Sequence, residues 1–350
     1  MKRVLKWLSG AVVLAVMALA LLFVQVWYFK PLKIDWFYTR IFAEFAMQSP
    51  EMLSSMRILP GWLDFHSDKL DDASPKQELA MADLVTRDLR TLHEYDRAAL
   101  DRDGQLSYDV LEYFLASMAE GQAYREHDFP LNQMFGVQSS LPDFMAQTHP
   151  ISSRRDADNY VARLRLFPRK FSQVLEGLEA REAKQMIPPQ FTVEKVLSQM
   201  REFVAPAPVD NMLYTTFVEK LDKLAPGTID DSQRARLLSE VEASIADQVY
   251  PAYAGLIAHF DALQPKAQGN FGAWHLPDGA AYYEWCVRMH TTTTMTPQQV
   301  HELGLAEVAR ISAGMDAILR ERGLDEGSVG ERVQQLARQP EQMYPNTEAG

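Results

Sequence analysis

The chain has 350 residues, of which 47% are hydrophobic and 23% are charged, and its formal net charge is −12. This is the composition of a folded globular protein with a sizeable core. The acidic balance excludes nucleic acid as a partner, because phosphate recognition needs clusters of Lys and Arg and no such run occurs. Cys286 is the single cysteine, so no intramolecular disulfide can form. We interpret Cys286 as a small buried hydrophobic residue.

The amino-terminal segment predicts a membrane anchor. Three basic residues within 1–6 precede an uncharged stretch over 7–29 that ends with Trp27 and Tyr28. As a helix this stretch would be about 34 Å long, enough for the hydrocarbon core, with aromatic residues at the interface. The early positive charges favour a cytoplasmic stub at 1–6. We therefore expect a single-pass signal anchor over 7–29 in a bacterial inner membrane, with the rest of the chain in the periplasm.

A cleaved signal peptide is the alternative, because Ala18-Leu19-Ala20 resembles a cleavage site. The apolar run continues past this point through residues 21–26, whereas the apolar region of a signal peptide normally ends sooner. No cysteine follows the run, which excludes processing as a lipoprotein. The sequence favours the uncleaved anchor.

The sequence after the apolar segment predicts successive amphipathic helices. Apolar residues recur at helical spacing over 193–204, 250–263 and 300–318. Ser74-Pro75-Lys76-Gln77 and Thr296-Pro297-Gln298-Gln299 have the form of helix starts, with a hydroxyl cap, proline at the first position and glutamine at the third. Ser49-Pro50-Glu51 is a weaker version.

Loops are predicted at 101–104, 205–208 and 226–227, where Gly, Pro and Asp gather. Alternation of strand type is scarce, and no stretch has the composition of an interdomain linker. The fold class is therefore all-α: one multi-helix domain over 35–350 behind the transmembrane helix. Residues 339–350 are polar and show no closing helix, an ending that we interpret as a truncation.

A search for catalytic motifs finds no complete set. A zinc hydrolase needs two histidines one helical turn apart with a glutamate between them. His93-Glu94 and His301-Glu302 each lack the second histidine, and Leu305 occupies its position after His301. We predict no metal ligand and no catalytic residue in this chain, and expect His301 on a solvated face.

The stretch from Trp274 to His290 has a composition suited to a binding pocket. The turn at Pro277-Asp278-Gly279 precedes an aromatic helix that runs into the threonines 291–294. Tyr283, Arg288 and His290 offer hydrogen bonds to a polar ligand. The alternative is aromatic core packing followed by a threonine-rich cap.

Several motifs of this chain resemble a bacterial family, domain of unknown function 885. They are Leu276-Pro277-Asp278-Gly279, Tyr282-Tyr283, Arg288-Met289-His290-Thr291-Thr292-Thr293, Thr296-Pro297, His301-Glu302-Leu303-Gly304-Leu305-Ala306-Glu307-Val308, Leu106-Ser107-Tyr108-Asp109, Pro130-Leu131-Asn132-Gln133-Met134, Ser140-Leu141-Pro142-Asp143-Phe144, Tyr160-Val161-Ala162-Arg163-Leu164 and Met186-Ile187-Pro188-Pro189. The resemblance spans nearly all of the chain after the apolar segment.

Members of that family look like zinc metallopeptidases of the gluzincin type, with a long helical fold. Their metal motif, a His-Glu-x-x-Pro-Gly-His-His variant, lies in the carboxyl half. The resemblance therefore implies a peptidase with zinc as cofactor in a full-length relative. This chain carries only the amino-terminal region, and we expect it to be inactive by itself. Tyr283, Arg288 and His290 become candidate contacts to a peptide substrate, because the Arg fork suits a terminal carboxylate.

Two hypotheses follow. In the first, the chain is the amino-terminal region of a membrane-anchored zinc-dependent peptidase. In the second, it is a non-catalytic, membrane-tethered helical module that binds a partner or ligand. A structural protein of the cell envelope has no positive feature in its support. The sequence does not determine the substrate or the oligomeric state.

Overall fold

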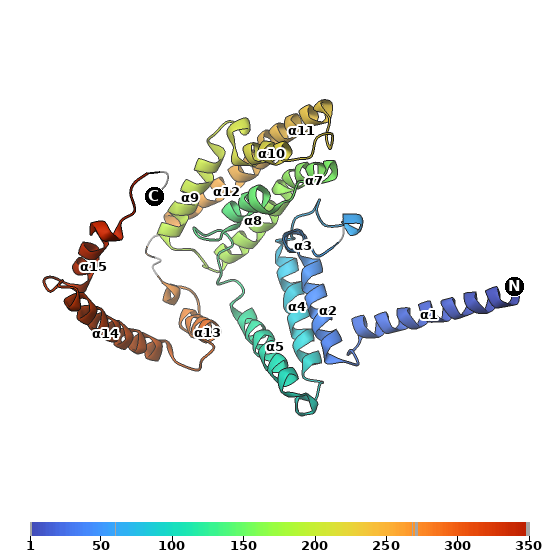
Figure 1. Ribbon diagram of the computed structural model, residues 1–350, viewed down its shortest axis with the longest axis horizontal. Helices are drawn as coiled ribbons and strands as arrows, with labels where there is room; N and C mark the ends of the chain where they lie inside the picture. Colours follow the sequence, from blue (N-terminus) through green and yellow to red (C-terminus); the bar gives the residue numbers. More distant parts are fainter. Residues whose placement is uncertain (1, 60, 268, 270–271, 348–350) are drawn as a thin grey trace. The chain divides into compact units, whose positions relative to one another are not determined.

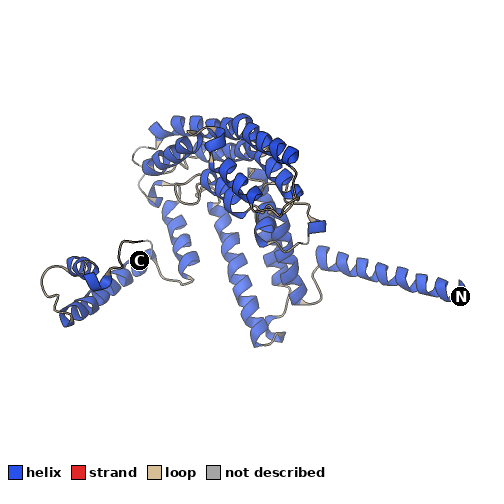
Figure 2. Ribbon diagram, turned by 45° about the horizontal axis from the view of Figure 1, so that its top comes forward, coloured by secondary structure: helices blue, strands red, loops and turns tan. Residues whose placement is uncertain are grey.

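The computed structural model describes residues 2–59, 61–267, 269 and 272–347, without the side chains of 2–6, 8, 9 and 11. Over these residues the chain forms helices, turns and loops and no strand, which confirms the all-α prediction (Figures 1 and 2). The α-helices before residue 165 are α1 (Lys2–Tyr28), α2 (Ile34–Gln48), α3 (Pro50–Met56), α4 (Pro75–Leu92), α5 (Arg102–Gly121), α6 (Val137–Asp143) and α7 (Arg154–Leu164). The later ones are α8 (Phe167–Ala183), α9 (Gln190–Val204), α10 (Met212–Asp222), α11 (Asp231–Ser244), α12 (Tyr250–Leu263), α13 (Gly279–Thr291), α14 (Pro297–Glu321) and α15 (Val329–Ala337).

Short helical turns connect several of these helices. Single 3₁₀ turns are η1 (Gly61–Leu63), η2 (Arg97–Ala99), η3 (Gln122–Tyr124), η5 (Pro208–Asp210), η7 (Gln264–Lys266), η8 (Ala273–His275) and η9 (Pro340–Gln342). Wider π turns, η4 (Phe144–Thr148) and η6 (Ile245–Val249), extend α6 and α11. Through η6, the chain runs from α11 into α12 without leaving a helical conformation.

The chain divides into two compact units, Met1–Pro277 and Asp278–Gly350. The boundary falls inside the predicted turn Pro277-Asp278-Gly279, where Asp278 has a left-handed backbone with φ 51°. The sequence predicts this turn, but the single domain predicted over 35–350 includes it. Each unit has its own helix packing.

The apolar segment 7–29 is helical, within α1. Across the part of the chain that the structure describes, no helix is both long enough and apolar enough to cross a membrane. The helical state of the segment agrees with the prediction, whereas its transmembrane role has no support from the described residues.

The larger core of the first unit lies among α6 to α12. Its fully buried aromatic residues include Tyr160, Phe171, Phe217 and Tyr253, and Tyr160 donates a hydrogen bond of 2.8 Å to the backbone oxygen of Leu213. The helices predicted over 193–204 and 250–263 are α9 and α12, and their apolar faces pack together in this core. The local periodicity therefore predicted both the helices and the sides they bury.

A smaller core joins α2, α4 and α5 through a buried cluster led by Phe37, Leu92 and Leu115 (Figure 1). Residues 101–104, predicted as a loop, instead open α5. Asp101 is its N-cap and accepts a hydrogen bond of 2.8 Å from the backbone N–H of Gly104. Asp101, of a type that usually favours a turn, here satisfies one of the free N–H donors of a helix start.

The second unit comprises α13, α14 and α15. Thr296 and Gln299 form the predicted capping box at the start of α14. The buried Arg332 of α15 pairs with Asp316 of α14 and holds the two helices together. The apolar stripe predicted over 300–318 lies largely in solvent: Val308 is 64% exposed and Ile318 56%.

Candidate functional site

The predicted substrate contacts all lie on α13. Tyr283 and His290 are exposed and fall about two turns apart on the same side of the helix, because seven residues span nearly two full turns. Arg288 is half-buried and projects from a different side of α13. The helix therefore groups Tyr283 with His290 and separates them from Arg288. Their assignment to substrate binding stays a prediction.

The described residues do not fit a zinc site. Within that part of the chain, no three His, Cys, Asp or Glu side chains are placed to hold a metal ion together. His93 lies at the end of α4 with its Nε2 3.3 Å from Glu112, and His301 is exposed on α14. We therefore derive no metal chemistry from the residues of this chain.

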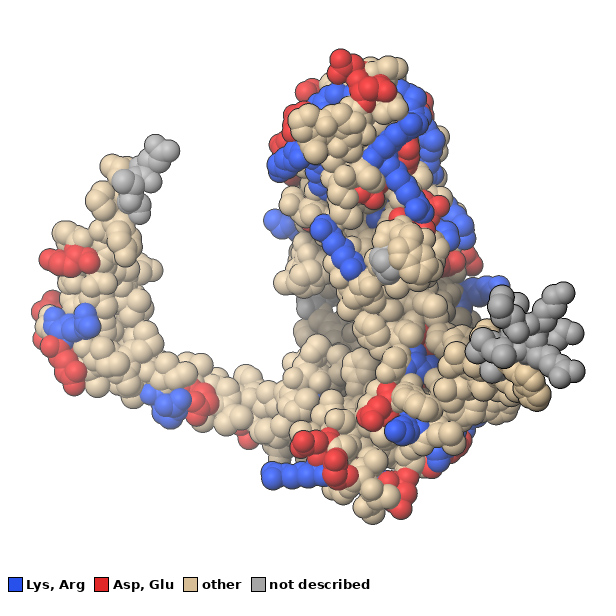
Figure 3. Space-filling model, turned by 45° about the vertical axis from the view of Figure 1, so that its right-hand side comes forward, with Lys and Arg blue, Asp and Glu red and all other residues tan. Residues whose placement is uncertain are grey.

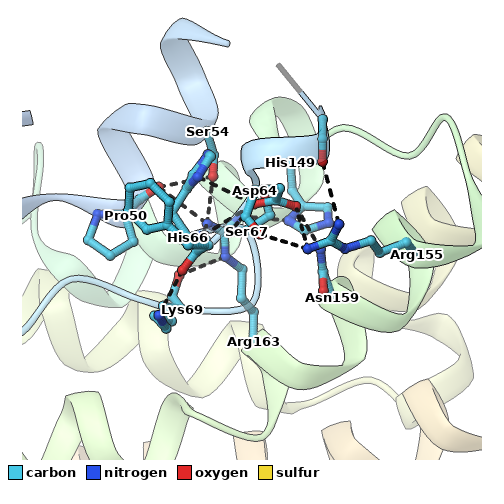
Figure 4. Close-up of polar contacts among 12 residues, drawn as sticks. Pro50, Ser54, Asp64, His66, Ser67, Lys69, His149, Arg155, Asn159 and Arg163 are labelled. Carbon is cyan, nitrogen blue, oxygen red and sulfur yellow. Dashed lines mark hydrogen bonds and ion pairs between the residues drawn. The ribbon is translucent and has the colours of Figure 1, made fainter. Parts of the chain in front are cut away.

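A polar cluster in the first unit centres on Arg163 (Figure 4). The helix α7 begins after Ser153, whose hydroxyl accepts the backbone N–H of Asp156. Tyr160 and Leu164 point into the apolar core, and Arg163 lies on the same buried side with no solvent exposure. The guanidinium therefore has to find all its partners inside the protein.

Arg163 links three distant segments of the chain (Figure 4). Its Nε donates to the backbone oxygen of Lys69 at 2.8 Å, and its Nη2 donates to the hydroxyl of Ser54 at 2.7 Å. Its Nη1 donates to Nδ1 of His149 at 2.7 Å. Longer bonds reach the backbone oxygens of Pro50 and His66. The arginine thus closes the 50–69 segment onto α7.

A cavity of about 440 Å³ opens beside this cluster. Ser54, Asp64, His66 and His149 are among its lining residues. Asp64 accepts the backbone N–H groups of His66 at 3.2 Å and Ser67 at 3.0 Å. Burial raises the pKa of the Asp64 carboxyl, but these donors outweigh it and hold the pKa below its usual value.

His66 lines this cavity while only 6% exposed. Its Nδ1 lies 3.3 Å from Asp64 Oδ1, but without the geometry of a hydrogen bond, so this buried nitrogen lacks a hydrogen-bond partner. Burial lowers the pKa of His66, and Arg163 adds to that effect. The ring is therefore neutral near pH 7.

Two cations reach the same cavity from other helices. Lys220 of α10 donates to the backbone oxygens of Met145 at 2.9 Å and His149 at 2.7 Å. Arg57 follows α3 with a left-handed backbone, φ 52°, a conformation that favours glycine or asparagine. Burial, then Arg57 and Lys223, lower the pKa of Lys220 to about 8. The lining of the cavity therefore includes the two cations Lys220 and Arg57 beside apolar side chains.

Sequence reasoning missed this cavity. Its residues come from 53–67, 147–156 and 220, far apart in the chain. One signal was available: Arg163 follows Tyr160 by three residues on α7, and so falls on the apolar side of that helix. A charged residue in a core register indicates a buried polar network.

The fold and site define an all-helical protein with a polar cavity at its larger core, and the comparisons place it in a family. The family described as "Bacterial protein of unknown function (DUF885)" matches residues 50–350. The chain belongs to this family, which confirms the resemblance seen in its motifs. No curated protein matches the chain.

Two solved structures share the fold. A protein described as "the putative lipoprotein from Colwellia psychrerythraea" has 22% sequence identity and a TM-score of 0.80 over 89% of this chain and 56% of its own. "A putative lipoprotein of unknown function from Shewanella oneidensis" has 13% identity and a TM-score of 0.59 over 87% of this chain and 52% of its own. The chain thus spans about half the length of either protein.

Proposed function

We propose that this chain forms the amino-terminal region of a membrane-anchored, zinc-dependent peptidase, with the zinc held by residues outside these 350. The observation that carries the proposal is the family match over 50–350, which includes the motifs on α13 and α14 that resemble this family. The exposed apolar stripe of α14 adds support, because a stripe of this size on a stable protein is normally covered.

In this proposal α13 contributes to the wall of a peptide-binding cleft. Tyr283 and His290 present hydrogen-bonding groups on one side of the helix. Arg288 supplies a fork that suits a terminal carboxylate. These residues bind and orient a peptide and take no part in bond cleavage.

Peptide hydrolysis by the product of the entire open reading frame tests the proposal. We expect hydrolysis that a chelator abolishes and added zinc restores. The Arg288→Met variant should raise KM for peptides with a free carboxylate by roughly tenfold, as the loss of a charge-assisted hydrogen bond predicts. Arg310→Met is the matched control, since Arg310 is exposed and pairs within α14 with Glu307. The proposal fails if the complete product hydrolyses no peptide with zinc present.

We further propose that residues 7–29 tether the protein to the bacterial inner membrane, with the helical units in the periplasm. Both solved neighbours are described as putative lipoproteins, and a lipid-linked tether needs a cysteine near the amino terminus. Here the single cysteine is Cys286, so the apolar segment is the available tether. Alkaline extraction of membranes should leave the protein in the pellet, and release into the supernatant would contradict the anchor.

The non-catalytic binding module remains a second candidate, favoured by the polar cavity beside Arg163. This alternative predicts that the complete gene product binds a ligand without hydrolysing it. Metal analysis of the purified 350-residue chain is informative for both candidates. Stoichiometric zinc would show that these residues hold a metal, which neither candidate expects.

A further inference from the structure

Two cationic side chains, Arg57 and Lys220, line the cavity beside Arg163. All five acceptors of the Arg163 guanidinium are neutral: three backbone oxygens, the hydroxyl of Ser54 and the ring of His149. Burial lowers the pKa of Arg163 to about 10, and the charges of Glu51, Asp71, Asp64 and Asp68 oppose that effect. A partly buried cation is costly, and an anion close to it lowers that cost.

The two carboxylates that line the cavity are already engaged. Asp64 accepts two backbone N–H groups, and the guanidinium of Arg155 approaches it from the rim. Asp156 accepts the backbone N–H and the hydroxyl of Ser152, at 2.9 and 2.8 Å. Both carboxylates therefore have hydrogen-bond donors of their own.

Donors remain for a bound molecule. An ammonium has three N–H groups, and the structure gives Lys220 two acceptors, both of them backbone oxygens. Arg57 reaches the cavity from an exposed position, and the described residues give its side chain no ion pair. Nδ1 of His66 is a third polar atom, buried and without a hydrogen bond. Burial, followed by the charges of Arg57 and Lys223, lowers the pKa of Lys220 to about 8, so the ammonium is still mostly charged at pH 7.

The walls of the cavity also include apolar side chains. Leu53 is buried, and Leu59 and Ile151 are half-buried. A cavity of about 440 Å³ falls in the range of small-molecule sites, which pair apolar walls with a few fixed polar groups.

We propose that this cavity binds the carboxylate of a small aliphatic organic acid, with the carboxylate at Arg57 and Lys220 and the aliphatic part against Leu53, Leu59 and Ile151. A carboxylate carries one negative charge and accepts bonds through two oxygens, which suits two cationic donors. The site is formed by residues of the first unit, whereas α13 belongs to the second unit. The proposal does not depend on peptidase activity.

Calorimetric titration of the 350-residue chain with N-acetyl-leucine tests the proposal. N-acetyl-leucinamide is the matched probe, because it has the same aliphatic group and no charge. We expect the acid to bind at least roughly tenfold more tightly than the amide, the ratio for one charge-assisted hydrogen bond. Equal affinity of acid and amide, or binding of neither, overturns the proposal.

Two variants locate the site. Arg57→Asn removes one charge, and asparagine tolerates the left-handed backbone at this position. Lys220→Met removes the second charge and keeps a side chain of similar length. Each should weaken binding of the acid roughly tenfold. Lys195→Met is the control: it removes a charge at an exposed residue of α9 outside the cavity, and should bind as the parent does.

Titration with inorganic phosphate tests whether the cavity prefers a carboxylate or a phosphate. We expect phosphate to bind more weakly than N-acetyl-leucine, because it cannot use the apolar wall. Tighter binding of phosphate that the same two variants weaken would overturn the carboxylate assignment. If Lys220→Met fails to fold, Arg57→Asn still decides, since Arg57 is exposed.

Discussion

Arg163 fixes the tautomer and the protonation state of His149. Nη1 of Arg163 lies 2.7 Å from Nδ1 of His149, and a guanidinium can only donate, so Nδ1 accepts. The proton of the neutral ring is then on Nε2, which donates to the backbone oxygen of Asp156 at 3.0 Å. A second ring proton would face the guanidinium. Burial, followed by the charge of Arg163, lowers the pKa of His149 to about 3.

The first prediction concerns pH. An unfolded histidine has a pKa of about 6.5, so between about pH 6.5 and pH 3 the unfolded chain binds one more proton at His149 than the folded chain. The stability gained from the neutral ring is complete above that window and is lost as the pH falls through it. The expected slope is about 1.4 kcal/mol per pH unit.

Urea unfolding at about pH 7 and pH 4.5 measures this effect. The His149→Asn variant is the comparison, because its amide oxygen can accept from Arg163 and does not titrate. We expect a smaller loss of stability on acidification in the variant than in the parent. Equal losses would show that other groups account for the whole pH dependence.

The second prediction concerns Arg163 itself. Arg163→Met keeps the apolar stem and removes the donor to the Lys69 backbone oxygen, the Ser54 hydroxyl and Nδ1 of His149, so we expect a loss of about 3 kcal/mol or more in the free energy of unfolding. Arg154→Met is the control on the same helix, where an exposed pair with Asp158 contributes about 0.5 kcal/mol or less. Urea unfolding of both variants checks the contrast, and similar costs would disprove the central role of Arg163.

The third prediction concerns the start of α14. Thr296→Ala removes the side-chain oxygen that accepts the backbone N–H of Gln299, and should cost about 1 kcal/mol of local helix stability. Amide hydrogen exchange in the first turn of α14 should accelerate accordingly. Thr294→Ala changes an exposed threonine of the same run outside the cap and should leave exchange unchanged. Faster exchange in both variants would argue against the capping role.

The fourth prediction contrasts neighbouring residues of α14. Leu319 is 3% exposed and Ile318 is 56% exposed. Leu319→Ala should destabilise the second unit by about 2–4 kcal/mol, because it opens a cavity. Ile318→Gln should change stability by about 0.5 kcal/mol or less. Hydrogen exchange over α14 and α15 measures both, and a large cost for Ile318→Gln would mean that the stripe is covered.

The sequence determined the features that depend on near neighbours. Helical spacing predicted α9, α12 and α14, and the caps at Ser74 and Thr296 follow from hydrogen bonds three residues away. Such interactions need no knowledge of the rest of the chain. The prediction was wrong at 101–104, because Asp and Gly open a helix there as readily as they form a turn.

Only the tertiary structure decided where the helices meet. It joined Arg163 to Ser54, Lys69 and His149 across segments that no sequence motif links. It also left the stripe of α14 in solvent, which periodicity alone assigns to a core. Periodicity shows which side of a helix is apolar, whereas burial depends on the partner that lies against it.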